Sequence, residues 1–272
     1  RGRRNASLEL PHILLLCDDD QKVLLEPIGA KKESLTKLYD FDLMEDGGHI
    51  TGYLVSGEEA AAFENRLTAY TAACPNKYRD LAGASLVFAV GDGNHSLATA
   101  KSCYEELKAQ NPGVDLSNHP ARYALVELEN IHDEAQQFEP IHRVVVETDP
   151  EALLAALEPW CAPDGYPITW YAGEKTGTVY LDRSRSQLEV GALQQFLDEY
   201  LGANPGKIDY IHGDEDLKTL ARQDRAIGFL LPAMAKSQLF RGVVADGVLP
   251  RKTFSMGHAR EKRYYLEGRK IK

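Results

Sequence analysis

One short stretch of the chain combines residue types that can bind an anionic ligand. It runs from Val87 to Lys101 and reads VFAVGDGNHSLATAK. Apolar residues lead through two glycines into a segment of helical character, which predicts a strand, a tight turn and a helix start. Glycine lets the backbone approach a ligand closely, and the first N–H groups of a helix favour an anion such as phosphate. These features predict a phosphate site formed by Gly91, Gly93, Asn94, His95 and Ser96.

Asp92 stands in the same turn, although its charge opposes an anion. A carboxylate at such a place can orient a metal ion, cap the helix or act as a base. The glycine spacing is neither the GxGxxG dinucleotide fingerprint nor a Walker loop, because no Lys-Ser/Thr pair follows the second glycine. From the residues alone, a phosphate site and a plain strand–turn–helix corner capped by Asp92 or Asn94 are both open.

Further donors for an anion occur at strand ends and in a basic loop. We expect a cleft that is completed by His142, Arg143, Arg251, Lys252 and His258. The last three belong to the segment GVLPRKTFSMGH, in which arginine and lysine suit phosphate or carboxylate. A structural, hydrogen-bonded role for each histidine stays open, as does docking of the basic tail on the acidic body. No histidine pair has HExxH or HxH spacing, so we expect no resident metal.

Composition limits the classes of function. The chain has 272 residues and a formal net charge of −10, with a pI of about 5.3, which argues against a nucleic-acid partner. Its last 22 residues, from Arg251 on, contain eight Lys or Arg and two Glu, a net +6, so the preceding 250 carry −16. No apolar run approaches the length of a membrane span. Four cysteines without CxxC spacing predict reduced thiols in a cytoplasmic protein.

The elements that must position these residues alternate along the chain. Apolar runs predict strands over residues 8–17, 23–25, 50–55, 86–90, 123–128, 138–146, 168–172, 178–181, 208–211 and 226–231. Helical spacing and cap residues predict helices over residues 57–74, 97–107, 150–157, 188–200, 215–221 and 233–240. Between the first two strands, three consecutive aspartates (residues 18–20) lack the spacing of a calcium loop and predict a solvated turn.

This alternation predicts an α/β or α+β fold, with a mixed sheet flanked by helices. A composition change divides the chain into two parts. Residues 1–148 contain the glycine turn, and residues 149–272 form an α/β part with the basic loop. We expect the two parts to pack together as one compact unit, because nothing between them has the composition of a flexible linker.

Several segments resemble a bacterial family catalogued as domain of unknown function 1015. They are LELPH, YDFDLM, VGDGNHSLATAK, FEPIHRVV, YIHG, IGFLLPAM, DGVLPRKTFSMGH and EKRYYLE. The resemblance spans nearly the whole chain and implies a family member that lacks roughly its first third. It implies no activity, because none is established for the family.

A local resemblance adds a functional expectation. GDGNHS is similar to the glycine–histidine motif of the ParB/sulfiredoxin superfamily, in which a strand–turn–helix holds nucleotide phosphates. Members of that superfamily include a free-serine kinase, sulfiredoxin and the ParB CTPases. Many carry arginine after the histidine, where this chain has Ser96. The missing charge would come from Arg143, Arg251 or Lys252, and the kinase-like members imply that Asp92 is a base or orients Mg²⁺.

The leading hypothesis is a cytoplasmic nucleotide- or phosphate-binding enzyme that acts as a small-molecule kinase on ATP or CTP with Mg²⁺. Its catalytic residues would be Asp92, His95 and His142. Its partner would be a small phosphate-bearing ligand, with neither nucleic acid nor membrane involved. Two alternatives stay open, a non-catalytic regulator that senses a nucleotide or metabolite, and a metal-dependent hydrolase. Neither the substrate nor the oligomeric state is predicted.

Overall fold

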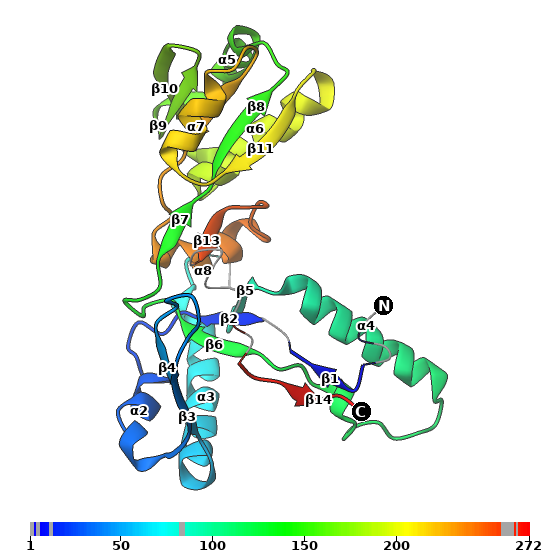
Figure 1. The fold of residues 1–272 in the computed structure, drawn as a ribbon. Coiled ribbons are helices and arrows are strands. Elements are labelled where there is room, and N and C mark those ends of the chain that lie inside the picture. Colours follow the sequence, from blue (N-terminus) through cyan, green and yellow to red (C-terminus); the bar gives the residue numbers. More distant parts are fainter. Residues whose placement is uncertain (1–2, 4–5, 11–12, 82–84, 257–263, 265) are drawn as a thin grey trace. The chain divides into compact units, whose positions relative to one another are not determined.

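The computed structural model describes the chain except residues 1–2, 4–5, 11–12, 82–84, 257–263 and 265. The chain forms two compact units, each built from segments that are discontinuous in sequence (Figure 1). Unit 1 comprises residues 1–77, 86–136 and 258–272, and unit 2 comprises residues 78–85 and 137–257. Residues 137–148, which the composition grouped with the glycine turn, belong to unit 2. The predicted class, a mixed α/β fold, is confirmed.

A three-stranded mixed sheet lies at the centre of unit 1. Its middle strand, β2 (Leu14–Cys17), pairs antiparallel with β5 (Ala89–Asp92) and parallel with β6 (Glu127–Asn130). The apolar run in β2 explains its place, since three of its four residues are buried. This arrangement puts the end of β5, where the glycine turn begins, beside the start of β2.

Helices and short strands surround this sheet. The helices of unit 1 are α2 (Glu26–Gly29), α3 (Gly57–Lys77) and α4 (Asn94–Gln110), with 3-10 turns at Lys32–Ser34 and Pro120–Arg122. An antiparallel hairpin joins β3 (Thr36–Asp42) and β4 (His49–Leu54). Near the two ends of the chain, β1 (Leu8–Glu9) pairs antiparallel with β14 (Arg269–Lys270).

Unit 2 contains a five-stranded antiparallel sheet in the order β10-β9-β12-β8-β11. Its strands are β8 (His142–Val146), β9 (Cys161–Ala172), β10 (Lys175–Leu181), β11 (Lys207–Ile211) and β12 (Ile227–Leu230). Its helices are α5 (Pro150–Leu157), α6 (Glu189–Ala203), α7 (Asp214–Ala221) and α8 (Lys236–Asp246), and 3-10 turns lie at Glu158–Trp160 and Arg183–Arg185. A separate pair joins β7 (Phe138–Pro140) to β13 (Phe254–Met256).

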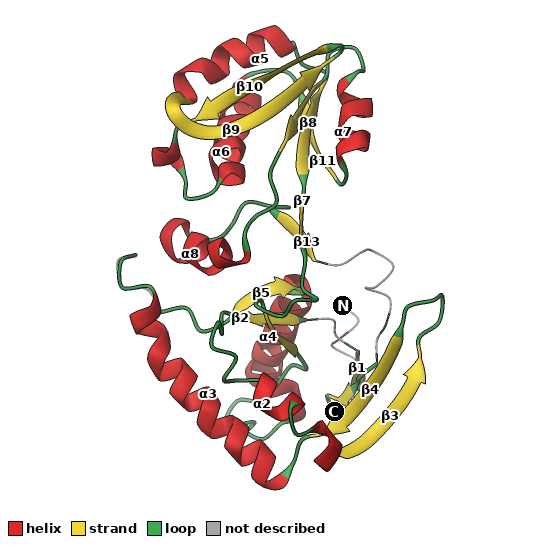
Figure 2. Ribbon diagram, turned by 90° about the vertical axis from the view of Figure 1, so that its left-hand side faces the viewer, coloured by secondary structure: helices red, strands yellow, loops and turns green. Residues whose placement is uncertain are grey.

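The two faces of the five-stranded sheet carry different helices. Figure 2 shows α7 on one side of the strands and α5 and α6 on the other. Gly228 of β12 lies beneath α7, and a Cβ there would stand 2.9 Å from Leu217 Cδ1. On the α7 face, Val144, Ile211 and Leu217 form a buried cluster. Because side chains alternate along β8, Val144 faces α7 while Arg143 and Val145 face α5 and α6.

Two predicted segments differ from the structure for identifiable reasons. Residues 23–25 are a bend rather than a strand, because the Leu24 N–H donates to Asp19 Oδ2 at 2.7 Å instead of to a neighbouring strand. Helix α3 continues past Pro75 to Lys77, whose ammonium group binds Asp20 Oδ1 at 2.9 Å. In both cases a contact with the Asp18–Asp20 turn overrides the local pattern.

Candidate functional site

The predicted strand–turn–helix is present in unit 1. Strand β5 ends at Asp92, Gly93 follows with φ +85° and ψ 16°, and α4 begins at Asn94. This left-handed conformation is one that glycine adopts without strain. The Asp92 carboxylate accepts the Gly93 N–H at 2.7 Å. Among the described residues no side chain caps α4, and its first turn contains no acidic residue. The positive end of the helix dipole therefore lacks a carboxylate within the helix itself.

A hollow of about 540 Å³ lies at the start of α4. His95, Ser96 and Thr99 form its helical side. Its other side comes from the N-terminal segment that contains β1, with the residues Arg3, Ala6, Leu8, Glu9 and Leu10. Asp92 is not among the lining residues. The hollow thus offers an imidazole and two hydroxyl groups beside a helix N-terminus.

Charged groups from both ends of the chain meet at this hollow. Glu9 is 8% exposed, and it forms ion pairs with Arg3 and with Arg269, whose Nη1 lies 3.7 Å from Glu9 Oε1. Glu9 Oε2 contacts Arg3 Nη1, and both carboxylate oxygens are buried. Burial lowers the pKa of the Arg3 guanidinium. The sequence analysis expected residue 143, 251 or 252 to supply a positive charge to the GDGNHS motif. It did not identify Arg3 and Arg269 as positive groups near this motif.

His142 is buried in β8 and held at both ring nitrogens. Its Nδ1 accepts the Leu231 N–H at 3.1 Å, so Nε2 carries the proton and donates to Asp214 Oδ1 at 3.0 Å. Burial lowers the pKa of His142, and the neighbouring Asp214 carboxylate partly opposes this. These contacts hold a neutral imidazole between β12 and the start of α7.

Arg143 is fully buried, and its donors bind other parts of unit 2. Its Nε donates to Gln194 Oε1 at 3.1 Å, and its terminal nitrogens donate to the backbone oxygens of Lys252 at 2.8 Å and Arg251 at 2.9 Å. A further bond goes to the Ile141 carbonyl. Burial lowers the pKa of this guanidinium to about 10. Arg143 therefore fixes the backbone of the 251–252 loop.

The remaining predicted residues are distributed as follows. The side chains of Arg251 and Lys252 are exposed, and Lys252 has a left-handed backbone with φ +56°. His258 lies outside the described residues. The structure brings residues 91–96 together in unit 1, and it brings Arg143 to residues 251–252 in unit 2. A composite cleft that draws on both units stays a prediction.

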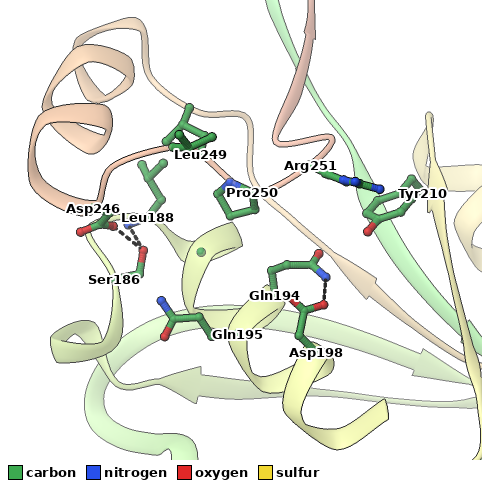
Figure 3. Close-up of a pocket in the computed structure, with 12 residues that line it drawn as sticks. Ser186, Leu188, Gln194, Gln195, Asp198, Tyr210, Asp246, Leu249, Pro250 and Arg251 are labelled. Atoms are coloured by element: carbon green, nitrogen blue, oxygen red, sulfur yellow. Dashed lines mark hydrogen bonds between the residues drawn. The ribbon is translucent and has the colours of Figure 1, made fainter. Parts of the chain in front are cut away.

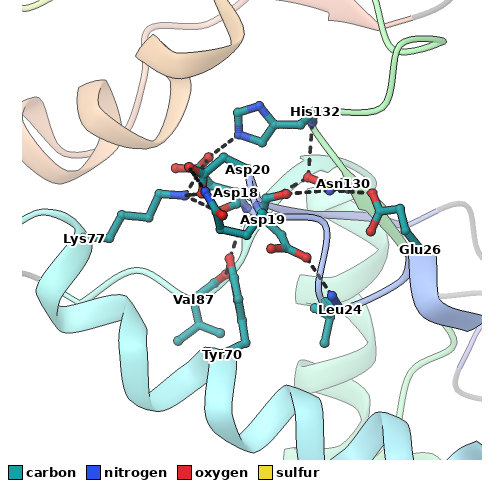
Figure 4. Close-up of polar contacts among 11 residues, drawn as sticks. Asp18, Asp19, Asp20, Leu24, Glu26, Tyr70, Lys77, Val87, Asn130 and His132 are labelled. Carbon is teal, nitrogen blue, oxygen red and sulfur yellow. Dashed lines mark hydrogen bonds and ion pairs between the residues drawn. The ribbon is translucent and has the colours of Figure 1, made fainter.

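The three consecutive aspartates do not form the solvated turn that was predicted. Asp18 and Asp19 are 6% and 3% exposed. Asp18 Oδ1 lies 2.6 Å from His132 Nε2 and 3.2 Å from Lys77 Nζ, and Asn130 Nδ2 donates to the Asp19 carbonyl at 2.8 Å (Figure 4). Partners from α3, from the end of β6 and from the turn after it, none of them near in sequence, bury Asp18 and Asp19, while Asp20 is exposed. Within the described part of the chain, no group of three or more His, Cys, Asp or Glu could hold a metal ion.

The family model for "Protein of unknown function (DUF1015)" matches residues 1–266. The chain belongs to this family. No functionally curated protein matches its sequence. No helix among the described residues is both long and apolar enough to cross a membrane.

Solved structures with partial likeness have low identity. A conserved hypothetical protein from Pyrococcus furiosus is 15% identical, with a TM-score of 0.42, over 66% of this chain and 73% of that one. A mutant free serine kinase in complex with AMP is 12% identical, with a TM-score of 0.40, over 95% and 88%. SbnI from Staphylococcus aureus is 12% identical, with a TM-score of 0.34, over 95% and 86%. These likenesses assign no function to this chain.

Proposed function

We propose that unit 1 binds the phosphate groups of a nucleotide in the hollow at the start of α4. The observation that carries this proposal is that His95, Ser96 and Thr99 line the same hollow as Arg3. A helix N-terminus favours an anion through its N–H groups and dipole. Hydroxyl and imidazole groups add donors, and a guanidinium binds phosphate oxygens in pairs. Residues 91–94 shape the turn that aims the helix at the ligand.

The charge balance of the hollow favours an anion. Among the lining residues Arg3 and Glu9 offset each other, and Arg269, which pairs with Glu9 from outside the lining, adds one positive charge. The helix dipole adds roughly half a positive charge at the start of α4. A phosphate would share Arg3 with Glu9, and Arg269 would remain beside the carboxylate. The arginine that is absent after His95 is thereby replaced by one from a distant segment.

Glu9 fits a magnesium ion that arrives with the nucleotide. Mg²⁺ usually binds through one or two carboxylates together with substrate phosphates and water. Both oxygens of Glu9 are buried and each forms one ion pair, with Arg3 and with Arg269, so the carboxylate keeps further lone pairs that such an ion would use. Bound there, Mg²⁺ would neutralise phosphate charge in a phosphoryl transfer. Glu9 would hold the ion, and Arg3 would orient the phosphates.

Transfer of a phosphoryl group to a small molecule is the activity that this site supports best, because it needs positioning and electrostatic stabilisation more than covalent chemistry. The proposed role of Asp92 is to fix Gly93, since its carboxylate accepts that residue's N–H. AMP and ADP in the free serine kinase structures belong to those proteins. The second candidate is a sensor that binds the nucleotide and releases it unchanged.

The test is calorimetric titration of the full chain with ATP and with CTP, each with and without Mg²⁺. We expect magnesium-dependent binding, and we expect Arg3→Gln to weaken it about tenfold, as for loss of a charge-assisted pair. Arg222→Gln is the matched control, because that arginine is exposed and lies in unit 2. Absence of heat at millimolar nucleotide would contradict the proposal. ³¹P spectra then separate a kinase, which consumes ATP, from a sensor.

A further inference from the structure

Unit 2 contains a second hollow with its own set of charged groups. It measures about 480 Å³ and lies among α6, β11 and the segment from Asp246 to Arg251 (Figure 3). Its residues belong to one unit, so its geometry does not depend on the placement of the other. Nothing in the proposed nucleotide site uses this hollow.

One end of the hollow presents a cation beside an anion. Figure 3 shows Arg251 next to Tyr210, with Gln194 and Asp198 nearby. No described residue pairs with the Arg251 guanidinium. Gln194 Nε2 donates to Asp198 Oδ1 at 2.8 Å, and no described residue bonds the second oxygen of that carboxylate. At this end of the hollow, the Arg251 guanidinium and one oxygen of the Asp198 carboxylate are therefore available to a ligand.

A single buried residue contacts the backbone of Arg251 and the glutamine that binds Asp198. Arg143 donates to the backbone oxygen of Arg251 at 2.9 Å and to Gln194 Oε1 at 3.1 Å. The same glutamine aims Asp198. Burial of a guanidinium is costly unless its donors are satisfied. The hydrogen bonds of Arg143 offset the cost of its burial, and two of its partners, Arg251 and Gln194, lie at this end of the hollow.

The middle of the hollow is lined by leucine and proline side chains together with Gln195, and a second carboxylate lies at its far end. Leu188, Leu249 and Pro250 lie between the two polar ends in Figure 3. At the far end, Asp246 Oδ2 accepts the Ser186 hydroxyl at 2.7 Å and the Gln187 N–H at 2.8 Å. The hollow thus has one guanidinium and two carboxylates, a net charge of −1.

We propose that this hollow binds an α-amino acid with a basic side chain. Arg251 receives the carboxylate, because a guanidinium matches its two oxygens. Asp198 receives the α-ammonium group. The methylene stem lies along Leu249 and Pro250, and the side-chain cation reaches the Asp246 end. A ligand of net charge +1 then balances the hollow. A free phosphate fits less well, since it would face two carboxylates.

The test is calorimetric titration of the full chain with lysine, arginine, leucine and glutamate. We expect lysine and arginine to bind, leucine at least tenfold more weakly, and glutamate not at all at 10 mM. Lysinamide lacks the free carboxylate, and Nα-acetyl-lysine lacks the α-ammonium group. We expect each to bind at least tenfold more weakly than lysine. Tightest binding of glutamate, or binding of inorganic phosphate in preference to lysine, would overturn the proposal.

Variants localise the ligand. Arg251→Gln and Asp198→Asn should each weaken lysine binding at least tenfold. Arg222→Gln and Asp224→Asn are the matched controls, because both residues are exposed in unit 2 away from the hollow. Unchanged near-ultraviolet circular dichroism shows that each variant is folded. If the two hollow variants bind lysine as the wild type does, or if no amino acid binds at all, the assignment is wrong.

Discussion

Two buried ionic groups in this molecule are arranged in opposite ways. Arg143 in unit 2 is satisfied by protein oxygens from three segments. Glu9 in unit 1 is paired only with the side chains of Arg3 and Arg269 among the described residues, and it lines a hollow. A buried charge whose bonds all go to protein stabilises a loop. A buried charge with bonding capacity left over is suited to a ligand.

The contrast between Arg143 and Glu9 predicts its largest effect on the free energy of unfolding. Arg143→Met should lower the free energy of unfolding of unit 2 by about 3 kcal/mol, because it leaves several buried carbonyl groups without donors. Arg3→Met should cost less, about 1–2 kcal/mol, because the buried Glu9 loses one ion pair but keeps the one with Arg269. Urea unfolding followed by circular dichroism gives both values. If both variants lower the free energy of unfolding equally, the two buried charges do not differ in the way described.

Magnesium dependence tests the spare capacity of Glu9. Glu9→Gln should strengthen ATP binding in EDTA about five- to tenfold, because a like charge near the phosphates is removed, worth about 1 kcal/mol. The same variant should lose the additional affinity that Mg²⁺ provides. Glu127→Gln is an exposed control in the same unit. A Glu9→Gln protein that responds to Mg²⁺ as the wild type does would assign the ion elsewhere.

The turn that aims α4 should be sensitive to a single methyl group. Gly93 has φ +85°, so Gly93→Ala should cost about 1 kcal/mol of stability through backbone strain. Nucleotide binding should weaken as well, because α4 would start at a different angle. Gly29→Ala is the matched control, since Gly29 has open space around its Cβ position and no positive φ. If Gly93→Ala and Gly29→Ala have the same stability and the same nucleotide affinity, the geometry of the turn at Gly93 does not contribute to nucleotide binding.

The smallest expected effect concerns His142. Burial lowers its pKa in the folded state, so between about pH 6.5 and the lowered value the unfolded chain binds more protons than the folded one. The contribution of His142 to stability is therefore complete above about pH 6.5 and declines as the pH falls. His142→Asn keeps an acceptor for the Leu231 N–H and should flatten this part of the pH profile. An unchanged slope in denaturant titrations at pH 5 to 7 would mean that other groups cause it.

Local patterns predicted much of this fold. Asp149 before Pro150 predicts the start of α5, and its carboxylate accepts the N–H groups of Glu151 and Ala152 at 3.0 and 3.3 Å. The strand predicted over residues 138–146 corresponds to β7 and β8, which are separated only at Ile141. The turn at Gly93 was predicted from the two glycines of one short segment. In each of these cases the signal lies within a few residues of the feature that it specifies.

The remaining features depend on contacts that a local pattern does not contain. Arg269 reaches Glu9 because β1 pairs with β14, which joins distant parts of the chain. Asp18 is buried because Lys77 and His132 come to it from α3 and from the turn after β6. Charged residues ordinarily predict exposure. Their burial was missed because the partners that make it possible are remote in sequence.

The central claim is that the start of α4 binds nucleotide phosphates. The most direct measurement is titration of ¹⁵N-labelled full chain with ATP and Mg²⁺, followed through the backbone amide signals of Asn94, His95 and Ser96. The account predicts saturable shifts of these signals, with much weaker shifts in Arg3→Gln. Signals that stay in place at millimolar ATP, or that shift equally in wild type and Arg3→Gln, would contradict it.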